Sequence, residues 1–160
     1  MNSIRSLGAL AAVATLTVVA SGVRSARGGE DAVRAVVPSE MKWSAVPGYP
    51  PGYARAMLEG EADKPVAFTY RVRLPGGFKF QPHTHAGDEH VTVLQGTWSL
   101  GIGERFEASR LKSFPAGSFV VVPASTPHFV SVETETIVQV HGVGPIGSTP
   151  VGESGSTTRR

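Results

Sequence analysis

Glycine and proline residues divide the middle of this chain into short segments, and this spacing is what most constrains the fold. Turn-forming groups occur at residues 75–77, 96, 114–117 and 123–127. Both residue types interrupt regular structure, because glycine adopts backbone angles that other residues avoid and proline lacks an amide hydrogen. The segments between them suit strands of about four to eight residues better than helices. We therefore expect many short strands and no major helix.

Residues 66–74 carry the clearest strand pattern. Apolar side chains occupy every second position, and the alternate positions are mostly threonine and arginine. Side chains two positions apart on a strand point to the same face, so this segment is predicted to cover a core with one face only. Similar but weaker patterns predict strands at residues 41–46, 53–58, 78–85, 90–95, 97–102, 119–122, 128–132 and 134–140, with a loop at 103–113. This arrangement is typical of a single all-β sandwich or barrel domain.

Composition and charge exclude several kinds of protein. The chain has 160 residues, a length suited to one domain, and an ordinary globular composition. Its net charge is only +2, and its basic residues form no cluster, so we expect no nucleic-acid partner. It contains no cysteine, which excludes disulfides, thiolate metal ligands and a cysteine nucleophile.

The N-terminus has the pattern of a secretion signal. Arg5 supplies a positive charge, residues 7–20 form an uncharged apolar run, and small residues follow at 20–22. We predict a signal peptide at residues 1–22, a periplasmic or secreted protein, and no membrane span after cleavage. The run is shorter than the ~20 residues of a spanning helix, and an uncleaved anchor is the alternative.

The remaining domain boundaries follow from composition. Residues 23–40 are predicted to form a linker with scattered charge, and residues 41–143 the β-barrel domain. The glycine, serine and threonine content of residues 144–160 predicts a flexible C-terminal tail.

The candidate functional residues lie around two histidines. His83 and His85 are two positions apart in an extended segment, and Glu89 follows a turn-like Ala-Gly-Asp sequence. Two imidazoles and a carboxylate that converge suit a divalent transition metal. His128, after the bend at 123–127, is a fourth candidate ligand.

These residues resemble the two signature motifs of the cupin superfamily. The first motif is matched in full by Gly77, His83, His85, Glu89 and Gly96, and the second by Gly117, Pro123 and His128. Ser125 stands where the family usually has glycine, and Val132 where it has asparagine. The chain is similar to small, exported single-domain cupins. The resemblance implies a jelly-roll barrel (a double-stranded β-helix) that holds one metal ion through His83, His85, Glu89 and His128.

The metal and the surrounding residues leave alternatives open. Imidazole and carboxylate ligands suit Fe, Mn, Ni, Cu or Zn, so the sequence does not identify the metal. His90 is predicted to face away from the site, and Asp88 to stabilise a turn. His141 is the only spare candidate for a catalytic group. It shares one strand face with Ile137 and Gln139, and whether that face points to the pocket or to solvent stays open.

The leading hypothesis is a metal-dependent cupin that binds and transforms a small organic molecule in the cell envelope, by dioxygenase-like chemistry. The alternatives are a non-catalytic module that binds or senses a small molecule through the metal, and a metal that only joins strands. The edge strand at 41–46 could pair with its counterpart in a homodimer.

Overall fold

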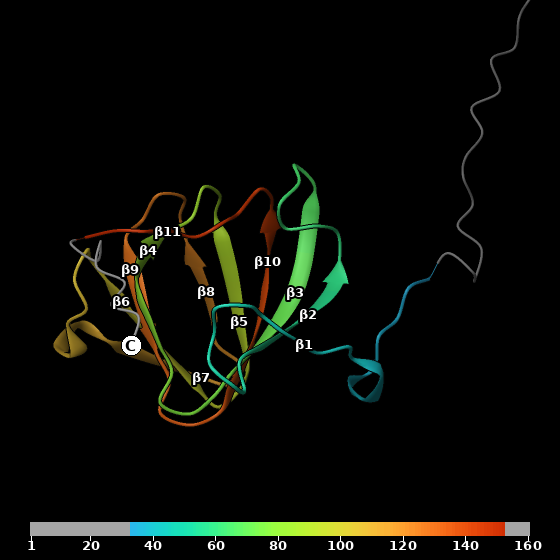
Figure 1. The fold of residues 1–160 in the computed structure, drawn as a ribbon, viewed down its shortest axis with the longest axis horizontal. Helices are drawn as coiled ribbons and strands as arrows, with labels where there is room; N and C mark the ends of the chain where they lie inside the picture. Colours follow the sequence, from blue (N-terminus) through green and yellow to red (C-terminus); the bar gives the residue numbers. More distant parts are fainter. Residues whose placement is uncertain (1–32, 153–160) are drawn as a thin grey trace, which may run out of the picture. The chain divides into compact units, whose positions relative to one another are not determined.

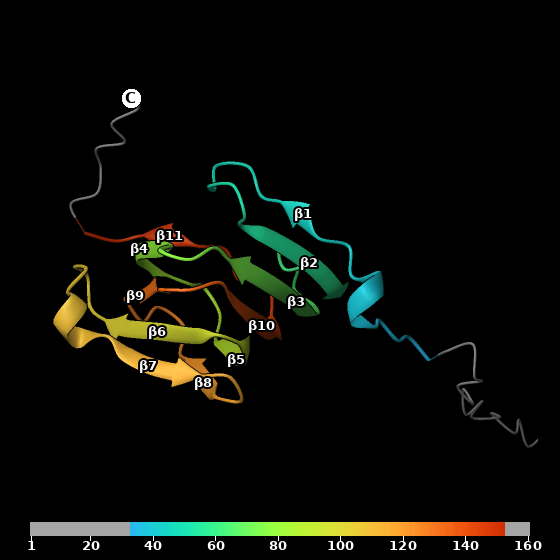
Figure 2. The same cartoon turned by 90° about the horizontal axis from the view of Figure 1, so that it is seen from below.

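The structure is a computed structural model that describes residues 33–152 of the chain. Residues 36–152 form a compact unit built from two antiparallel sheets (Figure 1, Figure 2). The predicted signal peptide and most of the predicted linker lie outside the described residues. In the described part, no helix is both long enough and apolar enough to cross a membrane.

The order of strands in each sheet differs from their order in the sequence. The six-stranded sheet consists, in spatial order, of β1 (Ser44–Ala45), β2 (Ala54–Glu59), β3 (Ala67–Leu74), β10 (Thr136–Val143), β5 (Glu89–Gln95) and β8 (Phe119–Val122). The five-stranded sheet consists of β11 (Thr149–Pro150), β4 (Lys79–Thr84), β9 (His128–Ser131), β6 (Thr97–Ile102) and β7 (Lys112–Pro115). Two short 3-10 turns, η2 (Pro38–Glu40) and η3 (Ala108–Arg110), are the described helical elements. The nearly all-β fold predicted from the glycine and proline spacing is thereby confirmed.

The core lies between the inner faces of the two sheets. Along β3 every second residue is buried, as the apolar alternation predicted. These side chains meet Trp98 and Leu100 of β6 and Val130 of β9, which come from the other sheet. Each large apolar side chain buried in this way contributes roughly 1.5–3 kcal/mol to stability. One side of each sheet therefore forms the interior of the unit.

Several strand boundaries differ from the predicted ones. The first strand is limited to β1, and Trp43 just before it packs under the guanidinium of Arg73, 4.4 Å from the ring centroid to Cζ. β7 begins within the predicted loop at 103–113. The residues of β7 are mostly exposed, so they show little alternation of apolar and polar side chains. β8 has the predicted bounds, and it lies at the edge of the six-stranded sheet with Phe119 58% exposed.

The predicted C-terminal tail also needs correction. Thr149 and Pro150 form β11, which pairs with Thr84 and His83 of β4. Ile146, just before this strand, is buried in the core. The chain therefore belongs to the five-stranded sheet up to residue 150. The sequence did not predict this strand, because main-chain pairing requires no apolar pattern.

The two departures from the cupin motifs occupy well-defined positions. Ser125 has a φ of 60°, the left-handed conformation that glycine adopts most easily, and its amide donates a hydrogen bond to the carbonyl of His85 over 2.9 Å. Val132 is only 1% exposed and belongs to the core. The serine therefore preserves the bend at some conformational cost, and the valine adds apolar contacts.

Candidate metal centre

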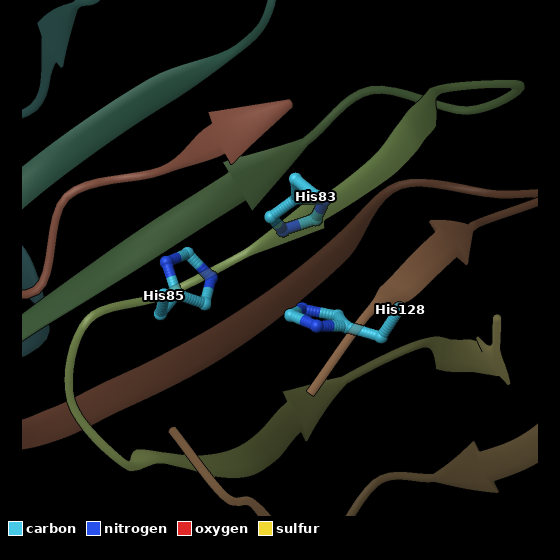
Figure 3. A group of neighbouring side chains, drawn as sticks. All are labelled: His83, His85 and His128. Atoms are coloured by element: carbon cyan, nitrogen blue, oxygen red, sulfur yellow. The ribbon is translucent and has the colours of Figure 1, made fainter. Parts of the chain in front are cut away.

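Three histidine side chains from two neighbouring strands converge inside the unit (Figure 3). His83 lies near the end of β4, His85 directly follows that strand, and His128 begins β9. One potential ligand nitrogen from each of the three lies within 4.8 Å of the others. His83 and His128 are direct register partners across the β4–β9 pair, so main-chain pairing fixes their proximity.

A β-bulge in β4 aims His83 into the interior. Phe80 pairs with Val130, but His83 pairs with His128, so β4 has one more residue than β9 in this interval. The extra residue reverses the alternation, and Phe80 and His83 therefore share the inner face although they are three positions apart. Their ring centroids are 4.1 Å apart. Bulges commonly re-aim a side chain next to a functional site in this way.

Each of the three rings has its Nδ1 atom hydrogen-bonded to a main-chain carbonyl. For His83 the acceptor is the carbonyl of Gln81, at 2.7 Å, and for His128 it is that of Thr126, at 3.0 Å. His85 donates to the carbonyl of Gly147. A carbonyl can only accept, so the proton of each neutral ring belongs on Nδ1 and Nε2 keeps a free lone pair. Such contacts orient the imidazole ligands of metal sites.

Burial keeps two of these imidazoles neutral. His83 and His128 are 4% and 1% exposed. Burial lowers the pKa of His83 to about 3, with a further contribution from the neighbouring His128, and burial also lowers the pKa of His128. Both rings can therefore accept a cation at neutral pH without first losing a proton.

The Nε2 atom of His128 is buried and has no hydrogen-bond partner in the described part of the chain. An unpaired buried polar atom costs roughly 1–3 kcal/mol, so such atoms are rare and call for an explanation. The chemistry of the donor set supplies one, because three imidazole lone pairs in one place suit a divalent transition metal. His83, His85 and His128 could thus hold such an ion.

Glu89 lies beside the three histidines. It opens β5, is 8% exposed, and has carboxylate oxygens 3.7 Å from Nε2 of His85 and 3.8 Å from Nε2 of His128. These distances are too long for hydrogen bonds, and burial raises the pKa of the carboxyl group. A cation bound nearby would lower that pKa and favour the ionised form.

The histidine group opens onto a cavity of about 530 Å³. Its wall is mainly apolar and aromatic, and includes Tyr53, Tyr70, Phe80 and Trp98. Such a volume is typical of sites for small organic ligands. Burial raises the pKa of Tyr53 and of Tyr70 well above the ordinary value, so both hydroxyl groups stay protonated and can donate hydrogen bonds.

The structure does not bring His141 to this cavity. The inner face of β10 carries Val138 and Val140, which line the cavity, whereas His141 lies on the outer face. There its Nε2 atom is 3.2 Å from Nδ1 of His90, the neighbouring residue on β5. Of the two faces left open for His141, the structure shows the outer one, because the apolar alternate residues of β10 take the inner face. This position argues against the candidate catalytic role of His141.

His90 and Asp88 lie where they were expected. His90 points to the outer face of the six-stranded sheet, opposite to Glu89. The Asp88 carboxylate accepts a hydrogen bond from the amide of Ala124 over 2.8 Å, and thereby ties the turn before β5 to the bend before β9.

Two facing antiparallel sheets, with a histidine group and a cavity between them, are the arrangement that the resemblance to cupins implied. The sequence model of the ChrR cupin-like domain family matches residues 31–146. The chain belongs to this family. No curated protein matches the sequence.

Solved structures with the same fold are distant in sequence. The polyketide cyclase RemF from Streptomyces resistomycificus is 17% identical, with a TM-score of 0.62 over 77% of this chain and 88% of the other. An RmlC-like cupin from Shewanella frigidimarina is 17% identical, with a TM-score of 0.53 over 74% and 91%. Salicylate 1,2-dioxygenase from Pseudaminobacter salicylatoxidans is 18% identical, with a TM-score of 0.50 over 62% of this chain and 30% of that chain. At these identities the likeness concerns the fold.

Proposed function

We propose that this protein binds one divalent transition metal ion through His83, His85 and His128, with Glu89 as a fourth ligand. The ion and the cavity together bind a small organic molecule and transform it by dioxygenase-like chemistry. The observation that carries the proposal is the matched orientation of the three imidazoles. Each ring has its Nδ1 hydrogen bonded to a carbonyl, which leaves three Nε2 lone pairs close together in the cavity wall.

A bound ion of this kind would supply Lewis-acid polarisation of a ligand oxygen and, if it is iron or copper, reactivity toward dioxygen. The chain itself contributes binding, orientation and exclusion of water. The hydroxyl groups of Tyr53 and Tyr70 donate hydrogen bonds to a bound ligand, and the aromatic wall removes its apolar part from water. The fold neighbours include a dioxygenase and a cyclase, so this scaffold supports more than one chemistry.

The first test is metal stoichiometry. Protein isolated from its native compartment is analysed for metal content, together with a His83→Gln variant and a matched His141→Gln variant from the outer face of the sheet. We expect one ion per chain in the wild type and in His141→Gln, and none in His83→Gln. A wild-type protein that takes up no iron, manganese, nickel, copper or zinc would exclude the proposal.

The second test separates turnover from binding. Oxygen uptake and absorption changes are measured with a panel of phenols and diketones, using protein loaded with the metal found in the first test. Oxygen consumption with a new product supports the dioxygenase-like reaction. A spectral change without product favours the second candidate function, a non-catalytic binding module. This candidate is worth testing because His141 does not line the cavity. A site that also rejects azide would leave the metal with a structural role.

We further propose that the protein acts outside the cytoplasm, in the periplasm or after secretion. The support for this location is the charged, apolar and small-residue pattern of residues 1–22. N-terminal sequencing of the protein recovered from fractionated cells tests it, with a mature N-terminus near residue 21 or 23 as the expected result.

A further inference from the structure

One arginine lies on the inner face of the six-stranded sheet. On β2, Arg55 is the register partner of Val72, and Met57 is the partner of Tyr70. Directly paired residues of antiparallel strands present their side chains on the same face, and Val72 and Tyr70 belong to the core. Arg55 and Met57 therefore point inward. Both line the cavity but remain exposed, because they lie where it opens to solvent.

The charge of Arg55 has no ion-pair partner among residues 33–152, which the structure describes. The ion pairs between described residues are Lys64 with Glu61, Arg110 with Glu107, and the two contacts of Glu89 with histidines. Glu61 and Asp63 also line the cavity. Lys64 holds Glu61 at 2.6 Å, and no ion pair between described residues joins either carboxylate to Arg55. The guanidinium of Arg55 instead lies over the ring of Tyr70, 5.4 Å from its centroid. A free cation therefore faces the cavity opening.

The cation and the metal centre belong to the same cavity. Arg55, Tyr53 and Tyr70 line it together with the three histidines and Glu89. The pKa of the Tyr70 hydroxyl, which burial raises, responds both to the negative charge of Glu89 and to the positive charge of Arg55. The same holds for Tyr53. The two tyrosines are thus within electrostatic range of both groups, and the wall between them is aromatic.

We infer that the cavity takes a small organic acid with an aromatic or otherwise apolar body, and that Arg55 binds its carboxylate at the opening of the cavity. The inference rests on the proposed function, because the same cavity would hold the acid beside the metal centre. An arginine can bind a carboxylate through two parallel N–H donors, which fixes the orientation of the acid and adds to its affinity. The apolar wall accepts the body of the molecule, while the positive charge of Arg55 selects for negative charge.

The alternative is that Arg55 only covers Tyr70 with its aliphatic stem and keeps its charge in water, as exposed arginines often do. In that case its charge would not affect ligand choice. The two possibilities differ in one measurable property, which is the preference of the cavity for an acid over a neutral molecule of the same shape.

The experiment compares acids with their amides. Isothermal titration calorimetry measures binding of benzoate against benzamide, and of 2-naphthoate against 2-naphthamide, to the full chain loaded with zinc, which has no redox chemistry. The variants are Arg55→Gln, Arg55→Lys and the control Arg105→Gln, which removes the same charge from an exposed position on the surface. The same titrations are repeated after removal of zinc.

We expect the wild type and Arg105→Gln to bind each acid at least about tenfold more tightly than its amide. Arg55→Gln should lose this preference without weaker binding of the amides, and Arg55→Lys should keep part of it. Equal affinity for acid and amide in the wild type, a preference that survives in Arg55→Gln, or no binding of either pair would overturn the inference.

Zinc stoichiometry separates this inference from the proposed function. A wild type that binds one zinc per chain but shows no acid preference overturns only the role of Arg55. A wild type that binds no zinc but still prefers the acids, with the preference lost in Arg55→Gln, supports the role of Arg55 and excludes the proposed function.

Discussion

Replacing His128 by leucine should stabilise the metal-free protein and abolish its stabilisation by metal. The Nε2 atom of His128 is buried and none of the described residues forms a hydrogen bond with it, so removing it recovers roughly 1–3 kcal/mol. The substitution also loses the hydrogen bond from Nδ1 to the Thr126 carbonyl, worth roughly 0.5–1.5 kcal/mol. Leucine has a similar volume and leaves no large cavity. The net gain for the metal-free protein is then about 1 kcal/mol, or about 3–5 °C in Tm for a domain of this size.

Metal should reverse this order of stability. At a metal concentration about 1,000 times the Kd, the wild type gains roughly 4 kcal/mol, whereas a variant without the site gains nothing. Urea unfolding of both proteins, with chelator and with zinc, measures the crossover. His141→Leu is the matched control, because His141 lies on the outer face of β10 and its loss should leave the zinc effect unchanged. The reasoning is refuted if His128→Leu is less stable than the wild type in chelator, or if it retains the zinc effect.

Three further outcomes are expected. Burial lowers the pKa of His83 to about 3, whereas in the unfolded chain it is about 6.5. Between pH 6.5 and pH 3 the unfolded chain therefore binds more protons than the folded protein. The metal-free protein should lose stability as the pH falls through this window, by up to about 1.4 kcal/mol per pH unit. Urea unfolding of wild type and His83→Leu measures this, and a stability difference independent of pH would contradict it. Ser125→Gly should stabilise the protein by about 0.5–1 kcal/mol in thermal unfolding, because Ser125 has a φ of 60°, and a destabilised variant would argue against strain there. Removal of residues 147–160 deletes the Gly147 carbonyl that accepts the His85 hydrogen bond. Competition titrations should then show zinc binding weakened roughly 10- to 100-fold. Unchanged zinc affinity would show that this contact does not orient the His85 ring.

Much of the fold could be predicted because its signals are local. The alternation at residues 66–74 corresponds to β3, whose inner face is buried and whose outer face is half-exposed. Glycine and proline marked most strand ends. β7 and β11 escaped prediction because their residues are exposed and short of apolar side chains, so that pairing with β6 and β4 alone defines them. A strand held mainly by main-chain hydrogen bonds leaves little trace in the sequence.

The candidate site was likewise predictable in part. The spacing of His83 and His85, with Glu89 and His128 at motif positions, pointed to the residues that the structure brings together. Their orientation could not be read from that spacing. The carbonyl that orients His85 belongs to Gly147, 62 residues away, and the bulge that turns His83 inward appears only in its pairing with β9.

His141 and Arg55 show most clearly what cannot be predicted from the sequence. The sequence assigns each of them to one of the two faces of a strand, but only the opposite sheet decides which face is enclosed. The structure puts His141 outside and Arg55 at the cavity opening. The sequence by itself thus determined the strands and the metal-ligand candidates, because both depend on residue type and short-range spacing. Only the tertiary structure decided which side chains share the cavity, because that depends on how two sheets from distant parts of the chain pack against each other.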